Sequence, residues 1–240
     1  MMKVTKPIRR TFLFLSILAL MNFAFVNCGV FDPPKSSSSK DDESSCTMAP
    51  VHLRSPTTID QVTELINALP KPLSIPCLIE NLPTPLKVFA VNSNFSAQPA
   101  EGADSPRIFI INGKLVLSVV PAGIGKDLLE YGQFINSTES VKAELKFPLE
   151  EQIALSQPYD HIKSGSGTSC RFCHTSERSI NGFGGEAFAS SIMRPSFFQR
   201  QTSARLRTLA QNCDKANDPY RCEMLNSVFV RGRAQDADLP

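Results

Sequence analysis

The stretch RIFIINGKLVLSVV, from Arg107 to Val120, decides the fold expected for this chain. It contains two runs rich in Ile, Val, Leu and Phe, and Asn112-Gly113 lies between them. Asn-Gly is the pair favoured at the centre of a type I′ turn, whose twist matches that of two paired strands. The stretch therefore predicts an antiparallel β-hairpin.

Further strands are expected on both sides of this hairpin. The run LKVFAV, residues 86–91, precedes it, and the runs LLEYGQFI and SVKAELKFP, residues 128–135 and 140–148, follow it. In the last run, charged residues alternate with apolar ones, so one face of the sheet is expected to contact water. Together these segments predict an antiparallel sheet.

Helices are expected before and after the sheet. The run TIDQVTELINALP, residues 58–70, places its apolar residues on one helical face, with Thr58 as a cap and Pro70 as a stop. Residues 71–85 carry four prolines and are expected to be extended or looped. After Pro148, helices are expected within three segments, residues 149–157, 196–211 and 220–230. The expected fold class is α+β, with an antiparallel sheet and a helix in residues 46–148 and a mostly helical domain in residues 149–240.

The N-terminus carries a targeting signal. Four basic residues precede an apolar run over residues 11–26, which is shorter than the roughly 20 residues that span a bilayer. Residues 1–27 are therefore expected to be a signal peptide. The net charge of the chain is only +2, with no basic stripe beyond this region, so no nucleic-acid partner is expected.

The segment FVNCG, residues 25–29, resembles the lipobox of bacterial lipoproteins, in which the cysteine receives the lipid. The strict pattern has Leu and a small residue where this chain has Phe25 and Asn27. The resemblance implies that Cys28 is a lipid anchor, and residues 28–45, rich in Ser, Pro and charge, then form the anchor and a flexible tether. An ordinary secreted protein is the alternative. The expected location is outside the cytoplasm, on the outer membrane or facing the periplasm.

The chain has seven cysteines, and an exported protein meets an oxidising compartment. With Cys28 assigned to the lipid and two others to the motif described next, four remain and allow three pairings. Locality favours two pairs, and the alternative is four buried free thiols. The two candidate disulfides are Cys46 with Cys77 and Cys213 with Cys222.

The segment Cys170-Arg171-Phe172-Cys173-His174 resembles the haem attachment site of c-type cytochromes. The resemblance implies that Cys170 and Cys173 bind haem c covalently and that His174 is the proximal iron ligand. Met193 is the candidate sixth ligand, with His161 as the alternative and a packing role as a further reading of the methionine.

Three other uses of the motif are open on the sequence alone. Zinc would need His174 and His161 besides the two cysteines. A thioredoxin-like redox pair would need a strand before the motif, where the sequence reads as a loop. A disulfide between Cys170 and Cys173 is the third.

The expected function is one-electron transfer by a membrane-anchored lipoprotein with a single haem. The main alternative is a non-catalytic envelope lipoprotein whose motif binds zinc or forms a disulfide. A haem enzyme is a third hypothesis, but such enzymes usually carry a second haem and this chain has one CxxCH motif. The redox partner is unknown.

Overall fold

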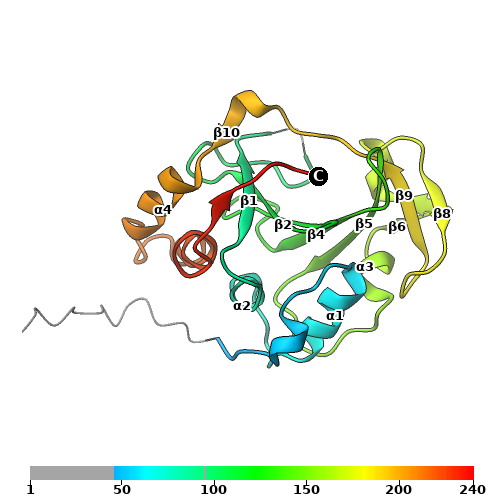
Figure 1. The fold of residues 1–240 in the computed structure, drawn as a ribbon, viewed down its shortest axis with the longest axis horizontal. Coiled ribbons are helices and arrows are strands. Elements are labelled where there is room, and N and C mark those ends of the chain that lie inside the picture. Colours follow the sequence, from blue (N-terminus) through cyan, green and yellow to red (C-terminus); the bar gives the residue numbers. More distant parts are fainter. Residues whose placement is uncertain (1–45, 95) are drawn as a thin grey trace, which may run out of the picture. The chain divides into compact units, whose positions relative to one another are not determined.

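A mixed sheet of nine strands runs through the part of the chain that the computed structural model describes, residues 46–94 and 96–240 (Figure 1). The strand order is β10-β1-β2-β3-β4-β5-β9-β8, and β11 pairs with β1 in parallel beside β10. All other neighbours in this sheet are antiparallel. The strands are β1 (Lys87–Val91), β2 (Arg107–Asn112), β3 (Leu115–Val119), β4 (Leu128–Phe134), β5 (Glu139–Lys146), β8 (Arg178–Ile180), β9 (Ala187–Ser191), β10 (Arg200–Gln201) and β11 (Gln235–Asp236).

The prediction of a mostly helical C-terminal domain is wrong. Four strands from the second half of the chain, β8 to β11, join the sheet that the first half begins, and the described residues belong to one compact unit. β9 pairs with β5 through residues 189–191, and β10 and β11 both pair with β1. These strands have only two to five residues. Pairing with a distant strand stabilises them, and such pairing leaves little trace in local sequence periodicity.

The central hairpin forms as predicted, but its turn is shifted by one residue. Asn112 pairs with Leu115, so Gly113 and Lys114 form the two-residue connection. Gly113 has a φ of 62°, whereas Lys114 does not have a positive φ. A type I′ turn needs positive φ at both central residues, so the predicted Asn-Gly turn of that type is not formed.

The helices are short. α1 (Ile59–Asn67) has Thr58 as its cap, as predicted. α2 (Ile75–Glu80) lies in the proline-rich segment that was expected to be a loop. Pro76 is in the first turn of α2, where a missing backbone N–H costs nothing, so the prolines do not prevent the helix. The helix expected over residues 149–157 is not formed, and α3 spans Gln157–Asp160 instead.

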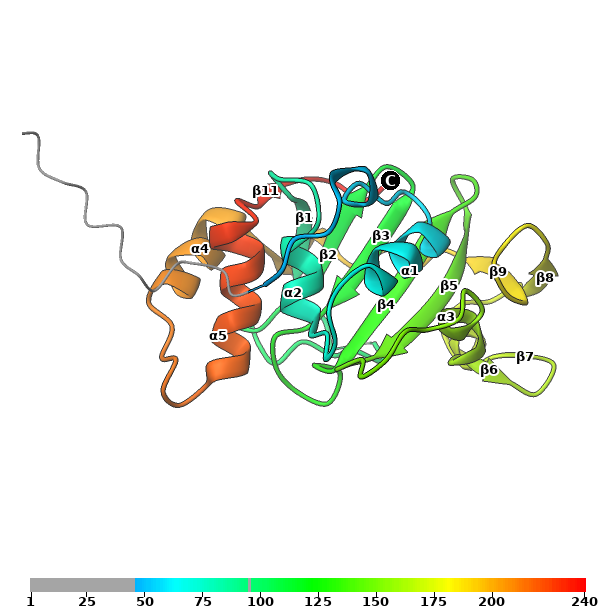
Figure 2. The same ribbon diagram turned by 90° about the horizontal axis from the view of Figure 1, so that it is seen from below.

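The two faces of the sheet have different coverings. Figure 2 shows α1 and α2 lying across one face, where the alternate apolar residues of β1 to β5 form the core. α4 (Ser203–Gln211) and α5 (Pro219–Leu225), which continues as a π-helical turn over Asn226–Arg231, lie beside β1. The chain between β9 and β10 crosses the other face (Figure 1).

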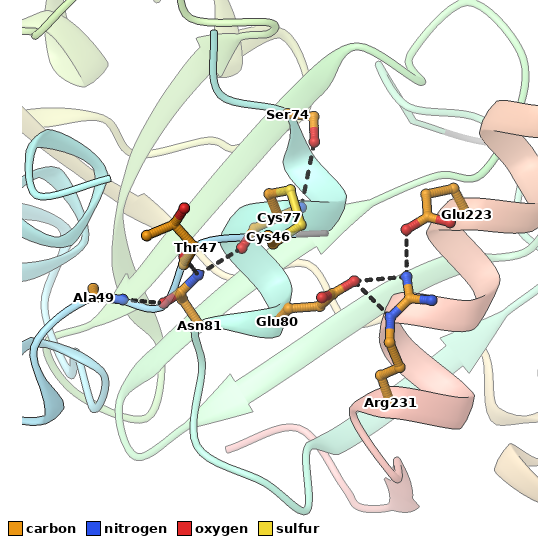
Figure 3. Close-up of a disulfide and its surroundings, with 9 residues drawn as sticks. All are labelled: Cys46, Thr47, Ala49, Ser74, Cys77, Glu80, Asn81, Glu223 and Arg231. Carbon is orange, nitrogen blue, oxygen red and sulfur yellow. Dashed lines mark hydrogen bonds and ion pairs between the residues drawn. A yellow bond between two sulfur atoms is a disulfide. The ribbon is translucent and has the colours of Figure 1, made fainter. Parts of the chain in front are cut away.

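A disulfide holds the start of the described chain to α2. Cys46 is bonded to Cys77, with their Cα atoms 5.4 Å apart, and Figure 3 shows the surrounding contacts. Below it, the Asn81 side chain accepts a hydrogen bond from Ala49 N at 2.7 Å and donates to Thr47 O at 3.1 Å. The bridge and Asn81 therefore fix the same strip of extended chain to the helix.

The second disulfide joins Cys213, just after α4, to Cys222 in α5, with Cα atoms 5.5 Å apart. Both bonds are the pairs that sequence locality favoured. Figure 3 also shows Arg231, from the π-helical turn, between Glu80 of α2 and Glu223 of α5. This ion-pair group ties the C-terminal helices to α2.

Candidate functional site

A cavity of about 430 Å³ lies on the sheet face opposite α1 and α2. Alternate residues of β2 to β5 form its floor, because side chains alternate between the two faces of a strand. The chain that crosses from β9 to β10 contributes residues 192–196 to its wall, and Leu239 near the C-terminus also lines it. The volume lies within the range of about 300–1,000 Å³ that is usual for ligand and cofactor sites.

Three residues of the CxxCH motif line this cavity, Cys170, Cys173 and His174. A small hairpin, β6 (Lys163–Ser164) and β7 (Gly167–Thr168), leads into a 3₁₀ turn over Ser169–Phe172. Glu177 accepts a hydrogen bond from Thr168 N at 2.8 Å and another from the Thr168 hydroxyl. These bonds join the residue before the 3₁₀ turn to a residue after the motif, so the motif lies in a loop that is closed by hydrogen bonds.

Four residues that the sequence assigned to haem come together at the cavity. They enter it from two segments, the motif loop and the chain after β9. They are Cys170, Cys173, His174 and Met193.

The imidazole of His174 is oriented by the sheet. Its Nδ1 lies 2.8 Å from the carbonyl oxygen of Ser191 at the end of β9. A carbonyl only accepts, so Nδ1 carries the proton, and Nε2 is then the unprotonated nitrogen that binds a metal. Burial lowers the pKa of His174 below its usual value, and nearby Lys142 lowers it further. The neutral imidazole, which is the ligand form, is therefore favoured.

The two motif cysteines are not bonded to each other in this structure. Cys170 is half-buried, whereas Cys173 is exposed. Burial raises the pKa of the Cys170 thiol to about 11, and the charge of Glu130 contributes to the same shift. A thiol with a raised pKa is a poor redox nucleophile, so this environment differs from that of a thioredoxin-like cysteine.

The two candidates for a sixth ligand are placed differently. Met193 lines the cavity from the wall opposite the sheet floor and keeps 46% of its surface exposed. His161, at the end of α3, is instead engaged with the floor strand β5, since its Nδ1 lies 3.1 Å from Glu144 Oε1. The structure therefore makes Met193 the better-placed candidate.

The floor of the cavity carries four charged residues that the sequence analysis did not assign to a site. Arg107 forms an ion pair with Glu130 and donates to Ser118 Oγ at 2.7 Å. Lys142 and Glu144 lie beside them on β5, and burial lowers the pKa of Lys142 to about 8. For Lys142 and Glu144, the alternating charges in residues 140–148 were the sequence signal that could have indicated a site. They were predicted to lie on a water-facing surface, and they line the floor of the cavity.

These features fit a covalently bound haem. The cavity has the size of a cofactor site, both cysteines reach it, and the histidine presents a free Nε2. Within residues 46–94 and 96–240, no three His, Cys, Asp or Glu side chains form a group able to hold a metal ion by themselves. No helix in that part of the chain is long and apolar enough to cross a bilayer. The predicted signal peptide, Cys28 and the tether lie outside the described residues.

The comparisons with known proteins give no relative for this chain: no protein-family model, no curated protein and no solved structure matches it.

Proposed function

We propose that this protein is a membrane-anchored c-type cytochrome lipoprotein that transfers single electrons. Cys170 and Cys173 hold haem c covalently, His174 is its proximal ligand and Met193 is its distal ligand. The observation that carries the proposal is the convergence of these four side chains on one cavity, with His174 Nδ1 bound to a backbone carbonyl. That bond is the usual second interaction of a metal-ligating histidine.

Bound haem supplies the one-electron chemistry, and the chain supplies its orientation and environment. Ser191 holds the His174 ring in one tautomer, so Nε2 is directed away from the carbonyl. A thioether ligand from Met193 favours the reduced state and raises the potential. The charged floor, where Arg107 is paired with Glu130, places fixed charge next to the site.

The membrane is the proposed first partner, through lipid on Cys28. The lipobox resemblance and the polar segment that follows it support this part. More than one acyl chain on the cysteine gives stable anchoring, whereas a single chain binds membranes only marginally. The domain would then work outside the cytoplasm, where c-type haem is attached.

The test is expression in a host that matures c-type cytochromes. Wild-type protein should keep its haem absorption through acid-acetone extraction and denaturing electrophoresis. The variant Cys170→Ala with Cys173→Ala should lose the colour completely. The control, Cys46→Ala with Cys77→Ala, also removes two cysteines but leaves the motif, so it should stay coloured.

Colourless wild-type protein would overturn the proposal. Stoichiometric zinc in such a protein, or a bond between Cys170 and Cys173 found by mass spectrometry, would favour the non-catalytic envelope lipoprotein instead.

A further inference from the structure

Two carboxylates face each other on the floor of the cavity. Glu130 of β4 and Glu144 of β5 are direct partners in the antiparallel register, so their side chains project on the same face. Both side chains are largely shielded, with 21% and 17% of their surfaces exposed. Two like charges at such a position disfavour each other's ionisation.

The neighbours of the two carboxylates differ. Arg107 of β2 forms an ion pair with Glu130. Glu144 has no arginine or lysine within ion-pair distance among the described residues, and its close contact there is the imidazole of His161. Burial raises the pKa of Glu144 above its usual value, and the charge of Glu130 adds to this shift.

His161 is the more exposed member of its pair with Glu144. Its Nδ1 lies 3.1 Å from Glu144 Oε1, and 37% of its side chain is exposed. An imidazole in this position can give a proton to the carboxylate from Nδ1 and take one from water at Nε2. Such a pair can exchange protons between the cavity floor and the solvent.

We propose that Glu144 is a proton-binding site of the cavity, connected to solvent by His161, and that it makes electron transfer at this site proton-coupled. The inference rests on the proposed function. When a one-electron donor adds one negative charge next to the floor, the Glu144 carboxylate takes up one proton through His161. The net charge of the cavity is then unchanged.

Other titratable groups lie around Glu144 and His161. Lys142 precedes it on the same face of β5, and Cys170 approaches from the motif loop. On the outer side, Lys163 is paired with Asp160 and Glu186. Glu144 is the floor carboxylate that contacts His161, whose side chain is 37% exposed.

The first experiment measures the midpoint potential of the full-length, haem-loaded protein by spectroelectrochemistry from about pH 4 to 9. The midpoint potential of the wild-type protein should fall as pH rises through the interval in which one group loses its proton. Glu144→Gln should abolish that slope while keeping the side chain's shape. Glu130→Gln should move the slope to lower pH, because it removes the like charge. The matched control is Glu139→Gln on the same strand, which is paired with Arg178 at 3.1 Å, and it should leave the slope unchanged.

The second experiment observes the Glu144 carboxyl directly, by ¹³C NMR of glutamate-labelled protein with Glu144→Gln used for assignment. Its pKa should lie above that of an ordinary glutamate and should fall in Glu130→Gln. Coloured Glu144→Gln protein that keeps the wild-type slope would overturn the inference and leave the cytochrome function standing. Colourless wild-type protein would overturn the function, and the NMR titration would then decide on the proton site. An ordinary Glu144 pKa that is insensitive to Glu130→Gln would reject that site.

Discussion

The two disulfides close loops of different length, so reducing them should cost different amounts of stability. Cys46 and Cys77 are 31 residues apart, whereas Cys213 and Cys222 are 9 apart. A disulfide acts largely by restricting the unfolded chain, and the restriction grows with the closed loop. The stability lost on reducing each bond can therefore be compared within one protein.

The expected magnitudes follow from loop-closure entropy. For the separation of 31 the stabilisation is about 3.7 kcal/mol at 25 °C, and for the separation of 9 it is about 2.6 kcal/mol. The difference of about 1 kcal/mol is measurable by urea denaturation. The long loop should therefore lose more stability on reduction.

The assay uses two double variants, each of which keeps one disulfide. Cys213→Ala with Cys222→Ala keeps the long loop, and Cys46→Ala with Cys77→Ala keeps the short one. Each variant is unfolded in urea with and without reductant. The truncated side chains are the same in both measurements, and any effect of the reductant on bound haem is common to the two variants, so comparing the two losses isolates the difference between the bonds. A smaller loss for the long loop than for the short loop would refute the reasoning.

Four further predictions concern the core, the cavity and the anchor. Phe229→Ala, at a fully buried position, should lower the free energy of unfolding by about 3–5 kcal/mol in urea denaturation, and a loss below 1 kcal/mol would contradict its place in the core. Glu144 has a raised pKa in the folded state, so its ionisation costs stability as pH rises through that pKa. Glu144→Gln should therefore raise the free energy of unfolding at pH 8 and leave it unchanged near pH 3. The reverse trend would show that the pKa of Glu144 is not raised by folding. Met193→Ala should remove the weak red absorption band of the ferric protein and lower its midpoint potential, whereas an unchanged spectrum would assign the sixth position to another group. Cys28→Ser should release the protein from membranes in a fractionation assay, and an unmodified peptide spanning residues 27–29 in the wild-type chain would contradict lipidation.

Local sequence was sufficient where one segment contains the whole signal. The hairpin over residues 107–120, the alternating strand over residues 140–148 and the helix capped by Thr58 are all formed. In each, the periodicity and the turn or cap residues lie within a few positions of one another. The CxxCH motif is of the same kind, since its two cysteines and its histidine are adjacent.

Local sequence was misleading where a proline-rich or polar segment was judged by composition alone. α2 forms despite its prolines, because Pro76 occupies the first helical turn. The chain after Pro148 was expected to be mostly helical, yet it adds four short strands to the sheet. Strands of this length have no stable periodicity of their own and form only against a partner.

The sequence by itself therefore determined the central strands, the motif and the candidate ligands, because those signals are local and covalent. Only the tertiary structure decided that Met193 lies on the same cavity as His174, and that His161 contacts Glu144. It also decided that the charged face of β5 is the floor of a cavity. The physical reason is that a strand pattern fixes which residues share a face, but the crossing of residues 192–196 over that face determines whether it is an open surface or the floor of a cavity.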